Sequence, residues 1–181
     1  AFFTCNYLLK VELINDGFDE MLADELTTRA AIGGIIGAKL YFIIENINNG
    51  SLIDTFDGFI NIITGIFTIN PEKISIGIQY IGSGLVFYGG LIGGTVAITL
   101  YIYKNNLIWL NIADWVAPYL ALGHSIGRIG CFLVGDDYGK ITEGWWGISF
   151  PNGMPPTNMP VHPTQLYEMS AYLLIFLYLR F

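Results

Sequence analysis

Long apolar runs alternate with short polar segments along the whole chain. A bilayer core about 30 Å thick requires about 20 apolar residues of helix, and several runs approach that length. We predict membrane spans at about residues 26–46, 81–103, 107–127 and 164–181, with residues 1–9 as the end of a preceding span. Residues 1–181 are therefore expected to form one membrane-embedded domain of the all-α class, a polytopic bundle of transmembrane helices.

Polar segments separate the predicted spans. Residues 10–29 are acidic and contain the turn-forming pair Asp16-Gly17, so they predict a loop. Residues 52–69 fit a short interfacial helix, although their glycines and β-branched residues weaken that prediction. Residues 139–161 are rich in Gly, Pro and Trp, and they predict a folded loop outside the membrane, on its outer side.

Small residues and one charge stand out within the predicted spans. Gly33 and Gly37 in one span, and Gly89 and Gly93 in the next, have the four-residue spacing that lets helices approach closely. Lys39 lies in the same span as Gly37. Two interpretations stay open for it: its ammonium extends to the membrane interface, or it lines a polar interior.

The composition favours a lipid environment. Hydrophobic residues make up 53% of the chain, and charged residues make up 13%, well below the roughly 25% of soluble domains. The mean hydropathy is +0.53. A net charge of −7 opposes nucleic-acid binding, which requires a basic surface. Cys5 and Cys131 match neither a metal-ligand spacing nor a disulfide framework, so no metal is expected.

Basic residues at the span ends indicate an orientation. If the spans alternate in direction, four of them fall on one side: Lys10, Arg29, Lys104 and Arg180. Cytoplasmic segments carry the excess of Lys and Arg in membrane proteins, so this side is predicted to be cytoplasmic. Tyr88, Arg128 and the 139–161 loop are then expected toward the outer face.

The segment from Gly127 to Gly139 carries the densest candidate chemistry. Arg128 stands at the end of a predicted span, and Asp136 and Asp137 follow it. A guanidinium is costly in hydrocarbon without a purpose, and its planar fork suits phosphate oxygens. Two interpretations stay open: an anion site at the outer interface, or an ion pair of Arg128 with Asp136 or Asp137 that holds the loop.

Three segments resemble motifs of the prolipoprotein diacylglyceryl transferase family. They are Gly127-Arg128-Ile129-Gly130-Cys131-Phe132, Phe87-Tyr88-Gly89-Gly90-Leu91-Ile92-Gly93, and His162-Pro163-Thr164-Gln165-Leu166-Tyr167-Glu168. A weaker match is Ile36-Gly37-Ala38-Lys39-Leu40-Tyr41, where the family usually has Arg in place of Lys39. The resemblance covers nearly the whole chain. The family's first and last spans have no counterpart, so we expect the chain to be part of a longer protein.

The resemblance implies an activity and a location. The family's enzymes are transferases of lipoprotein biosynthesis, so we expect a multi-pass protein of the bacterial cytoplasmic (inner) membrane. The donor would be phosphatidylglycerol, and the acceptor would be the lipobox cysteine in the signal peptide of a prolipoprotein. Glycerol phosphate would be released. The implied partners are these substrates and membrane lipid, without nucleic acid, cofactor or metal.

The resemblance also assigns candidate catalytic residues. Arg128 would stabilise the departing phosphate. Tyr88 replaces the family's His, and a phenol is a weak base at neutral pH, so Tyr88 would orient the phosphate or the thiol. His124, four residues before Arg128, is a further candidate base or, alternatively, a buried histidine with satisfied hydrogen bonds. Cys131 replaces the family's Asn, and we interpret it as a small apolar packing residue.

Further residues of these motifs are candidates for substrate binding beside Arg128. They are Gly89, Gly90, Gly130, Asp136, Gly139, His162, Gln165, Tyr167 and Glu168. An anchor at the start of a helix is the alternative interpretation for His162 and Glu168. Two other functions also stay open: a family member of altered or lost chemistry, and a non-catalytic membrane protein that binds or transports lipid.

Overall fold

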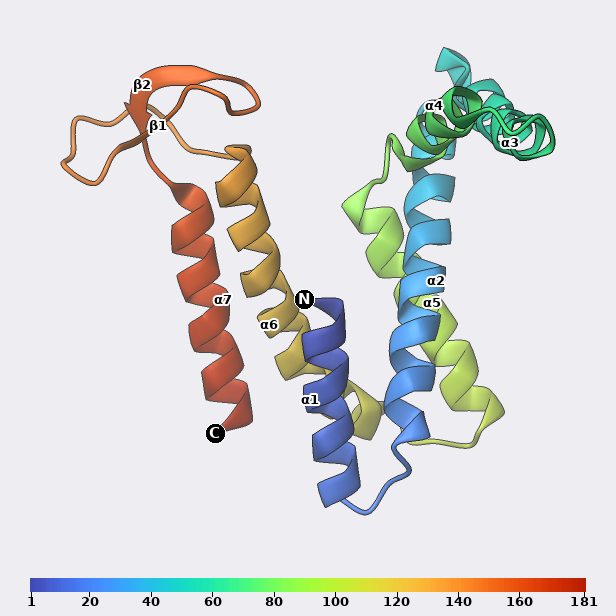
Figure 1. Cartoon of the computed structure of the whole chain (residues 1–181). Coiled ribbons are helices and arrows are strands. Elements are labelled where there is room, and N and C mark those ends of the chain that lie inside the picture. Colours follow the sequence, from blue (N-terminus) through green and yellow to red (C-terminus); the bar gives the residue numbers. More distant parts are fainter. The chain divides into compact units, whose positions relative to one another are not determined.

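The structure, a computed structural model, describes all 181 residues, which form seven α-helices, a short 3₁₀ helix and a two-stranded sheet (Figure 1). In chain order these are α1 (Phe2–Asn15), α2 (Met21–Glu45), η1 (Ile47–Asn49), α3 (Ser51–Phe67), α4 (Pro71–Gly82), α5 (Phe87–Lys104), α6 (Trp109–Val134), β1 (Ile148–Phe150), β2 (Thr157–Val161) and α7 (Thr164–Arg180). The sequence predicts one domain, whereas the chain divides into two compact units. The first unit comprises residues 1–24 and 108–181, and the second comprises residues 25–107.

The helices show which predicted spans are continuous. α2 is long and apolar enough to cross a membrane by itself, whereas α4 and α5 are long and apolar enough only together and are bent by 83° at their junction. The prediction of a single helical span at 81–103 is therefore wrong. Gly84 adopts a left-handed conformation there, with φ of +68°, which interrupts the helix between Gly82 and Phe87.

Packing of α1 against α6 organises the core of the first unit. Leu9 and Leu13 of α1 lie buried with Ala23 and with Tyr119 of α6. The predicted loop at residues 10–29 is wrong over most of its length, since α1 continues to Asn15 and α2 begins at Met21. The apolar spacing of Leu9 and Leu13 buries one face of α1, and this burial stabilises a helix despite the acidic residues beside it.

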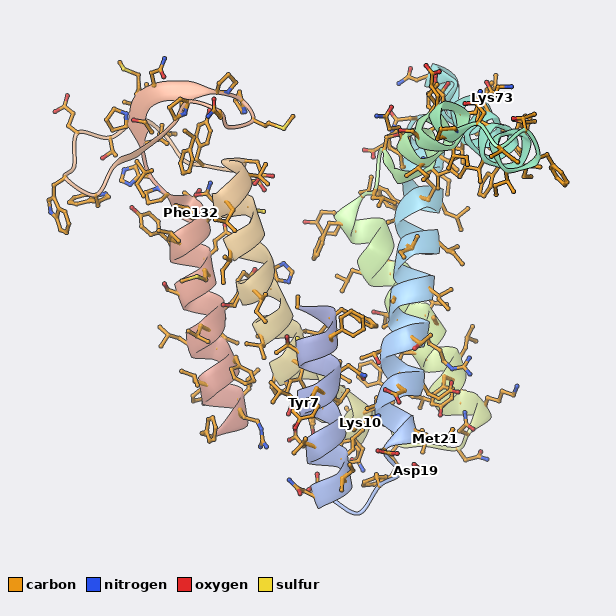
Figure 2. All side chains as sticks on the ribbon, viewed as in Figure 1. Tyr7, Lys10, Asp19, Met21, Lys73 and Phe132 are labelled. Atoms are coloured by element: carbon orange, nitrogen blue, oxygen red, sulfur yellow. The ribbon has the colours of Figure 1, made fainter.

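Salt bridges and hydrogen bonds fasten this end of the first unit. Lys10 on α1, labelled in Figure 2, lies with its amine 2.9 Å from a carboxylate oxygen of Asp24 in the first turn of α2. Glu12 of α1 accepts a hydrogen bond from the Tyr119 hydroxyl and lies 3.5 Å from a guanidinium nitrogen of Arg180 at the end of α7. α1, α6 and α7 are thereby joined by polar contacts as well as by the apolar core.

α6 and α7 run side by side, with the small sheet at one shared end (Figure 1). β1 and β2 pair antiparallel, so the predicted loop at 139–161 is folded. Phe150 of β1 packs edge-on against Phe132 near the end of α6, labelled in Figure 2, with ring centroids 5.8 Å apart. Tyr138 stacks on Phe150 at 5.5 Å. These rings fasten the loop to the helix pair.

Glycines bring the helices of the second unit into backbone contact. A Cβ added to Gly37 of α2 would lie 2.7 Å from the Cα of Gly93 on α5, and one added to Gly33 would lie 2.7 Å from the Gly93 carbonyl oxygen. The predicted small-residue packing is confirmed. The predicted helix at 52–69 is confirmed as α3, which packs on α4 where Gly58 and Gly77 meet.

The α2–α5 contact gives a first testable prediction. Gly37→Ala should lower the free energy of unfolding by about 1–3 kcal/mol, because the added methyl overlaps the α5 backbone. The matched control is Gly34→Ala on the same helix, where the new Cβ would meet its nearest neighbour at 3.5 Å. That variant should be neutral or slightly stabilising, since Ala favours helix over Gly. Thermal unfolding of both variants in detergent tests this, and equal midpoints would contradict it.

Candidate active site

Arg128 lies on α6 between two carboxylates. Its Nη1 is 3.0 Å from Asp137 Oδ2, and its Nη2 is 2.7 Å from Glu168 Oε2. The Arg128 side chain is 23% exposed, so the three charges meet at the edge of the helix pair. Of the two interpretations of Arg128, the ion pair with a loop carboxylate is present, and Asp137 is the partner. Glu168 is a second partner, which the sequence suggested only as a candidate for substrate binding.

The end of α6 explains how Asp137 reaches Arg128. The helix does not stop at the predicted boundary of 127 but continues to Val134, and Gly135 ends it with a φ of +75°. Asp137 has a φ of 54°, a left-handed conformation that Asp tolerates better than most residues. The two left-handed residues turn the chain back, so that the Asp137 carboxylate faces the helix that precedes it.

The beginning of α7 fastens this loop. Gln165 is fully buried, and its side-chain amide donates a hydrogen bond to the Asp136 carbonyl oxygen. The Thr164 hydroxyl donates to the Asp137 carbonyl oxygen at 2.6 Å, and the Gly139 amide donates to the His162 carbonyl oxygen at 2.8 Å. Gln165 and Gly139 therefore hold the loop in place. Oδ1 of Asp136 and Oε1 of Gln165 are buried without a hydrogen-bond partner.

Cys131 lies beside the guanidinium. Its sulfur is 3.6 Å from Arg128 Nη1, because the two residues are three apart on one helix. The interpretation of Cys131 as a purely apolar packing residue is therefore wrong. Potential metal-ligand atoms of Cys131, Asp136 and Asp137 lie within 4.8 Å of one another, and Arg128 supplies a positive charge beside them. Gly130, one residue away, faces open space.

His162 belongs to an aromatic cluster at the start of α7. The Trp146 indole N–H donates to His162 Nδ1 at 3.4 Å, and the Tyr167 hydroxyl lies 3.2 Å from the same nitrogen. An indole nitrogen can only donate, so Nδ1 is an acceptor and the ring proton of a neutral His162 lies on Nε2. His162 can thus offer Nε2–H as a hydrogen-bond donor. The sequence assigned no chemistry to Trp146, and nothing in its spacing indicated this contact.

His124 lies one helical turn before Arg128. Because α6 is continuous here, the two side chains share a face. The His124 ring packs against Tyr172 of α7, with ring centroids 4.7 Å apart. This contact fits a histidine packed between two helices, and its role as a base stays a prediction.

The second unit holds the other candidate residues. Tyr88 stands in the first turn of α5, is 67% exposed and packs edge-on against Phe87 at 5.9 Å. Gly89 and Gly90 face α2 instead of open space: a Cβ on Gly89 would lie 3.0 Å from the Ala38 Cα, and one on Gly90 would lie 3.4 Å from the Gly34 carbonyl oxygen. These two glycines therefore serve helix packing.

The motifs on α5, α6 and α7 agree with a comparison to known families. A model of the prolipoprotein diacylglyceryl transferase family matches residues 1–181. The chain belongs to this family. The match spans the whole chain, including residues 45–80.

Similar proteins carry the name phosphatidylglycerol–prolipoprotein diacylglyceryl transferase. The protein of Clostridium tetani is 38% identical over 153 residues, which are 84% of this chain and 53% of the relative. That of Leptospira interrogans is 34% identical over 192 residues, covering 100% of this chain and 58% of the relative. That of Aliivibrio salmonicida is 32% identical over 156 residues, covering 86% and 47%. The chain spans about half the length of the curated relatives it matches.

The two ion pairs of Arg128 give a second prediction. Double-mutant cycles with Arg128→Met should yield a larger coupling energy for Glu168→Gln than for Asp137→Asn. The Glu168 pair is shorter and its side chain is 42% exposed, against 67% for Asp137. Solvent screening should hold the Asp137 coupling to a few tenths of a kcal/mol, whereas the Glu168 coupling should be about 1 kcal/mol. Thermal unfolding of the wild-type protein, the three single variants and both double variants measures this. A larger coupling for Asp137 would contradict the prediction.

Proposed function

We propose that the protein to which this chain belongs transfers a diacylglyceryl group from phosphatidylglycerol to the lipobox cysteine of a prolipoprotein. Membership of the family and the names of the relatives support this activity. The observation that carries it at the level of residues is a half-buried Arg128 near the end of α6, with Glu168 on α7 and the more exposed Asp137 as its carboxylate partners.

The reaction is a substitution at carbon. The cysteine sulfur of the prolipoprotein attacks the glyceryl carbon that bears the phosphate, a C–S bond forms and the C–O bond to phosphate breaks. The bonding electron pair leaves with the phosphate oxygen, and glycerol phosphate departs. The thiol loses its proton to a base, since the thiolate is the nucleophile. Negative charge grows on the leaving group, so a fixed cation beside it lowers the barrier.

Arg128 is the cation in this proposal, and Asp137 is the group that the lipid phosphate replaces. The Asp137 side chain is 67% exposed and can turn into water, whereas Glu168 lies closer and extends from a helix. Exchange of one monoanion for another leaves the net charge of the cluster unchanged. Glu168 would continue to orient the guanidinium, whose planar fork then presents its other edge to the phosphate.

The remaining roles fall to Tyr88, His124 and His162. Tyr88 is exposed at the start of α5, and its hydroxyl can orient the phosphate or the thiol by hydrogen bonding. His124 is the candidate base, because it shares a helix face with Arg128 and an imidazole nitrogen can accept a proton. His162 would donate from Nε2, since Trp146 occupies Nδ1. No step requires a metal or a cofactor.

A multi-pass location in the bacterial cytoplasmic membrane is part of the proposal. The apolar helix α2 and the bent pair α4–α5 support it, as do the many exposed apolar side chains of α5, α6 and α7. The basic residues near the span ends would lie on the cytoplasmic side, namely Lys10, Arg29, Lys104 and Arg180, and the loop with β1 and β2 would face outward. Phosphatidylglycerol and the signal peptide would then meet at the outer interface.

Altered chemistry is the second candidate function. Tyr88 and Cys131 stand where the family motifs carry His and Asn, and Cys131 contacts Arg128 directly. A different lipid donor would suit such a site equally well. Transfer assays with phosphatidylglycerol and with other phospholipids, using one lipobox peptide as acceptor, separate the two candidates.

Topology provides the third prediction. In intact cells, a cysteine at position 152 (Asn152→Cys) should react with a membrane-impermeant maleimide, whereas one at position 105 (Asn105→Cys) should not. The native cysteines Cys5 and Cys131 are first replaced by Ala. Reaction at position 105 without reaction at position 152 would show that the orientation is the reverse of the predicted one.

The fourth prediction concerns Arg128 itself. In the full-length protein, Arg128→Ala should reduce transfer by about 10²–10³-fold, the usual effect of removing one preorganised group that stabilises the leaving charge. Arg128→Lys should keep only a small part of the transfer activity, because an ammonium carries the charge but lacks the planar fork. Phosphatidylglycerol, a lipobox peptide and proteoliposomes suffice for the assay.

Two controls separate catalysis from folding. Protein yield and thermal midpoint are measured for each Arg128 variant, and Asp137→Asn is assayed beside them. Under the proposal, Asp137→Asn lowers KM for phosphatidylglycerol, since the competing carboxylate is gone. A folded Arg128→Ala protein with near-normal transfer would remove Arg128 from the mechanism.

A further inference from the structure

The break between α4 and α5 lies directly before the candidate residue Tyr88. α4 ends at Gly82, α5 begins at Phe87, and their axes meet at 83°. Within the break, Ser83 donates from its amide to the Gln79 carbonyl oxygen and from its hydroxyl to the Tyr80 carbonyl oxygen, both on α4. α2 contacts the break from outside α4 and α5.

Three consecutive contacts from α2 hold the break. The Lys39 amine donates to the carbonyl oxygens of Tyr80 and Ser83, at 2.8 and 3.0 Å. The Phe42 ring packs against Gly84, so closely that no side chain fits at this left-handed position. The Ala38 carbonyl oxygen accepts a hydrogen bond from the Val86 amide at 3.4 Å. The end of α4 and the start of α5 therefore both contact the same turn of α2.

The chemistry of Lys39 suits this position. The last carbonyl groups of a helix carry partial negative charge and have no partners within the helix. Lys39 supplies a positive charge and two hydrogen bonds at that point, and no carboxylate lies within salt-bridge distance of its amine. The amine also lies 5.2 Å from the centre of the Phe42 ring. Lys39 therefore pairs with no acid; its amine binds backbone carbonyl oxygens.

The position of Tyr88 follows from this contact. Tyr88 is in the first turn of α5, and that turn rests on α2 where Gly37 and Gly89 meet. α2 thus determines both the direction of α5 and the point at which the helix starts. A change in the break would rotate the first turn of α5 and move the exposed Tyr88 ring with it.

We propose that Lys39 is a positioning residue for the transfer reaction, which acts by holding the α4–α5 break and thereby the Tyr88 hydroxyl. The inference rests on the proposed function in one respect, namely that Tyr88 orients a substrate. The claim that Lys39 holds the α4–α5 break does not depend on the proposed function, and a distance measurement tests it without an activity assay.

The first arm of the test measures the break. Spin labels are placed at Ile78 on α4 and Leu91 on α5, which are 59% and 51% exposed, with Cys5 and Cys131 replaced by Ala. Electron–electron resonance gives the distance distribution across the break in the full-length protein. Lys39→Met should broaden or shift the distribution, and Lys39→Arg, which keeps charge and donors, should restore it. Lys73→Met, at an exposed lysine of α4 labelled in Figure 2, is the matched control and should change nothing.

The second arm measures transfer in proteoliposomes of phosphatidylglycerol with a lipobox peptide. Lys39→Met should lower kcat by about 10- to 100-fold, the range expected when a group is displaced by about an ångström, and Lys39→Arg should recover most of it. Tyr88→Phe should slow the wild-type protein but have less than about a twofold effect in the Lys39→Met background, because Tyr88 is already misplaced there. This loss of additivity distinguishes positioning from general stability.

The outcomes separate the inference from the proposed function. An unchanged distance distribution in Lys39→Met overturns the hold on the break. If the distance distribution changes but Lys39→Met and Tyr88→Phe lower the transfer rate by independent, multiplying factors, Lys39 does not act through Tyr88. A protein without transfer activity, or one indifferent to Arg128→Ala, refutes the proposed function, while the distance measurement still decides the hold. Should Lys39→Met fail to fold, Lys39→Gln, which keeps two N–H donors without the charge, replaces it in both arms.

Discussion

The arrangement at the end of α6 depends on the charge of Arg128. A guanidinium at the end of an apolar helix pair must be compensated, because an unpaired charge there is far more costly than in water. The compensation comes from Asp137 in the loop and Glu168 on α7. Meeting both carboxylates requires a left-handed turn after Val134 and a fixed start of α7. The course of the loop meets these two requirements, and the contacts of Phe132, Phe150 and Tyr138 hold the small sheet on the helix pair.

In the proposed mechanism, the same ion pairs leave the candidate site able to take a ligand. A cation that is fully buried between two firm partners would have no capacity for a ligand. Here Asp137 is the more exposed partner and Glu168 extends from a helix, so under the proposed function an incoming phosphate would compete with Asp137. Gln165, Thr164 and Gly139 keep the loop backbone in place during such an exchange, since they bind its main chain and leave the carboxylate free.

The second unit follows a different principle, contact between backbones. Glycines at 33, 37, 89 and 93 let α2 and α5 touch without intervening side chains. At this distance a lysine on α2 can reach the carbonyl groups of the neighbouring break, and Lys39 does so. Both units therefore use a basic residue on a helix to determine the path of a non-helical segment, through carboxylates in one unit and through carbonyl groups in the other.

Local patterns in the sequence determined the helical class, the glycine contacts and the motif residues, because helix formation and close packing depend on residues a few positions apart. The boundaries of 10–29 and 81–103 were mispredicted where a non-local contact decides: Leu9 and Leu13 bury against Tyr119 and so extend α1, and Gly84 is held against Phe42 and so interrupts the predicted span. Sequence also identified Arg128 but left its partner open, and it did not connect Glu168 with Arg128 or Trp146 with His162. Those pairings join segments distant along the chain, and only the folded chain, by bringing α6, the loop and α7 to one end, could decide them.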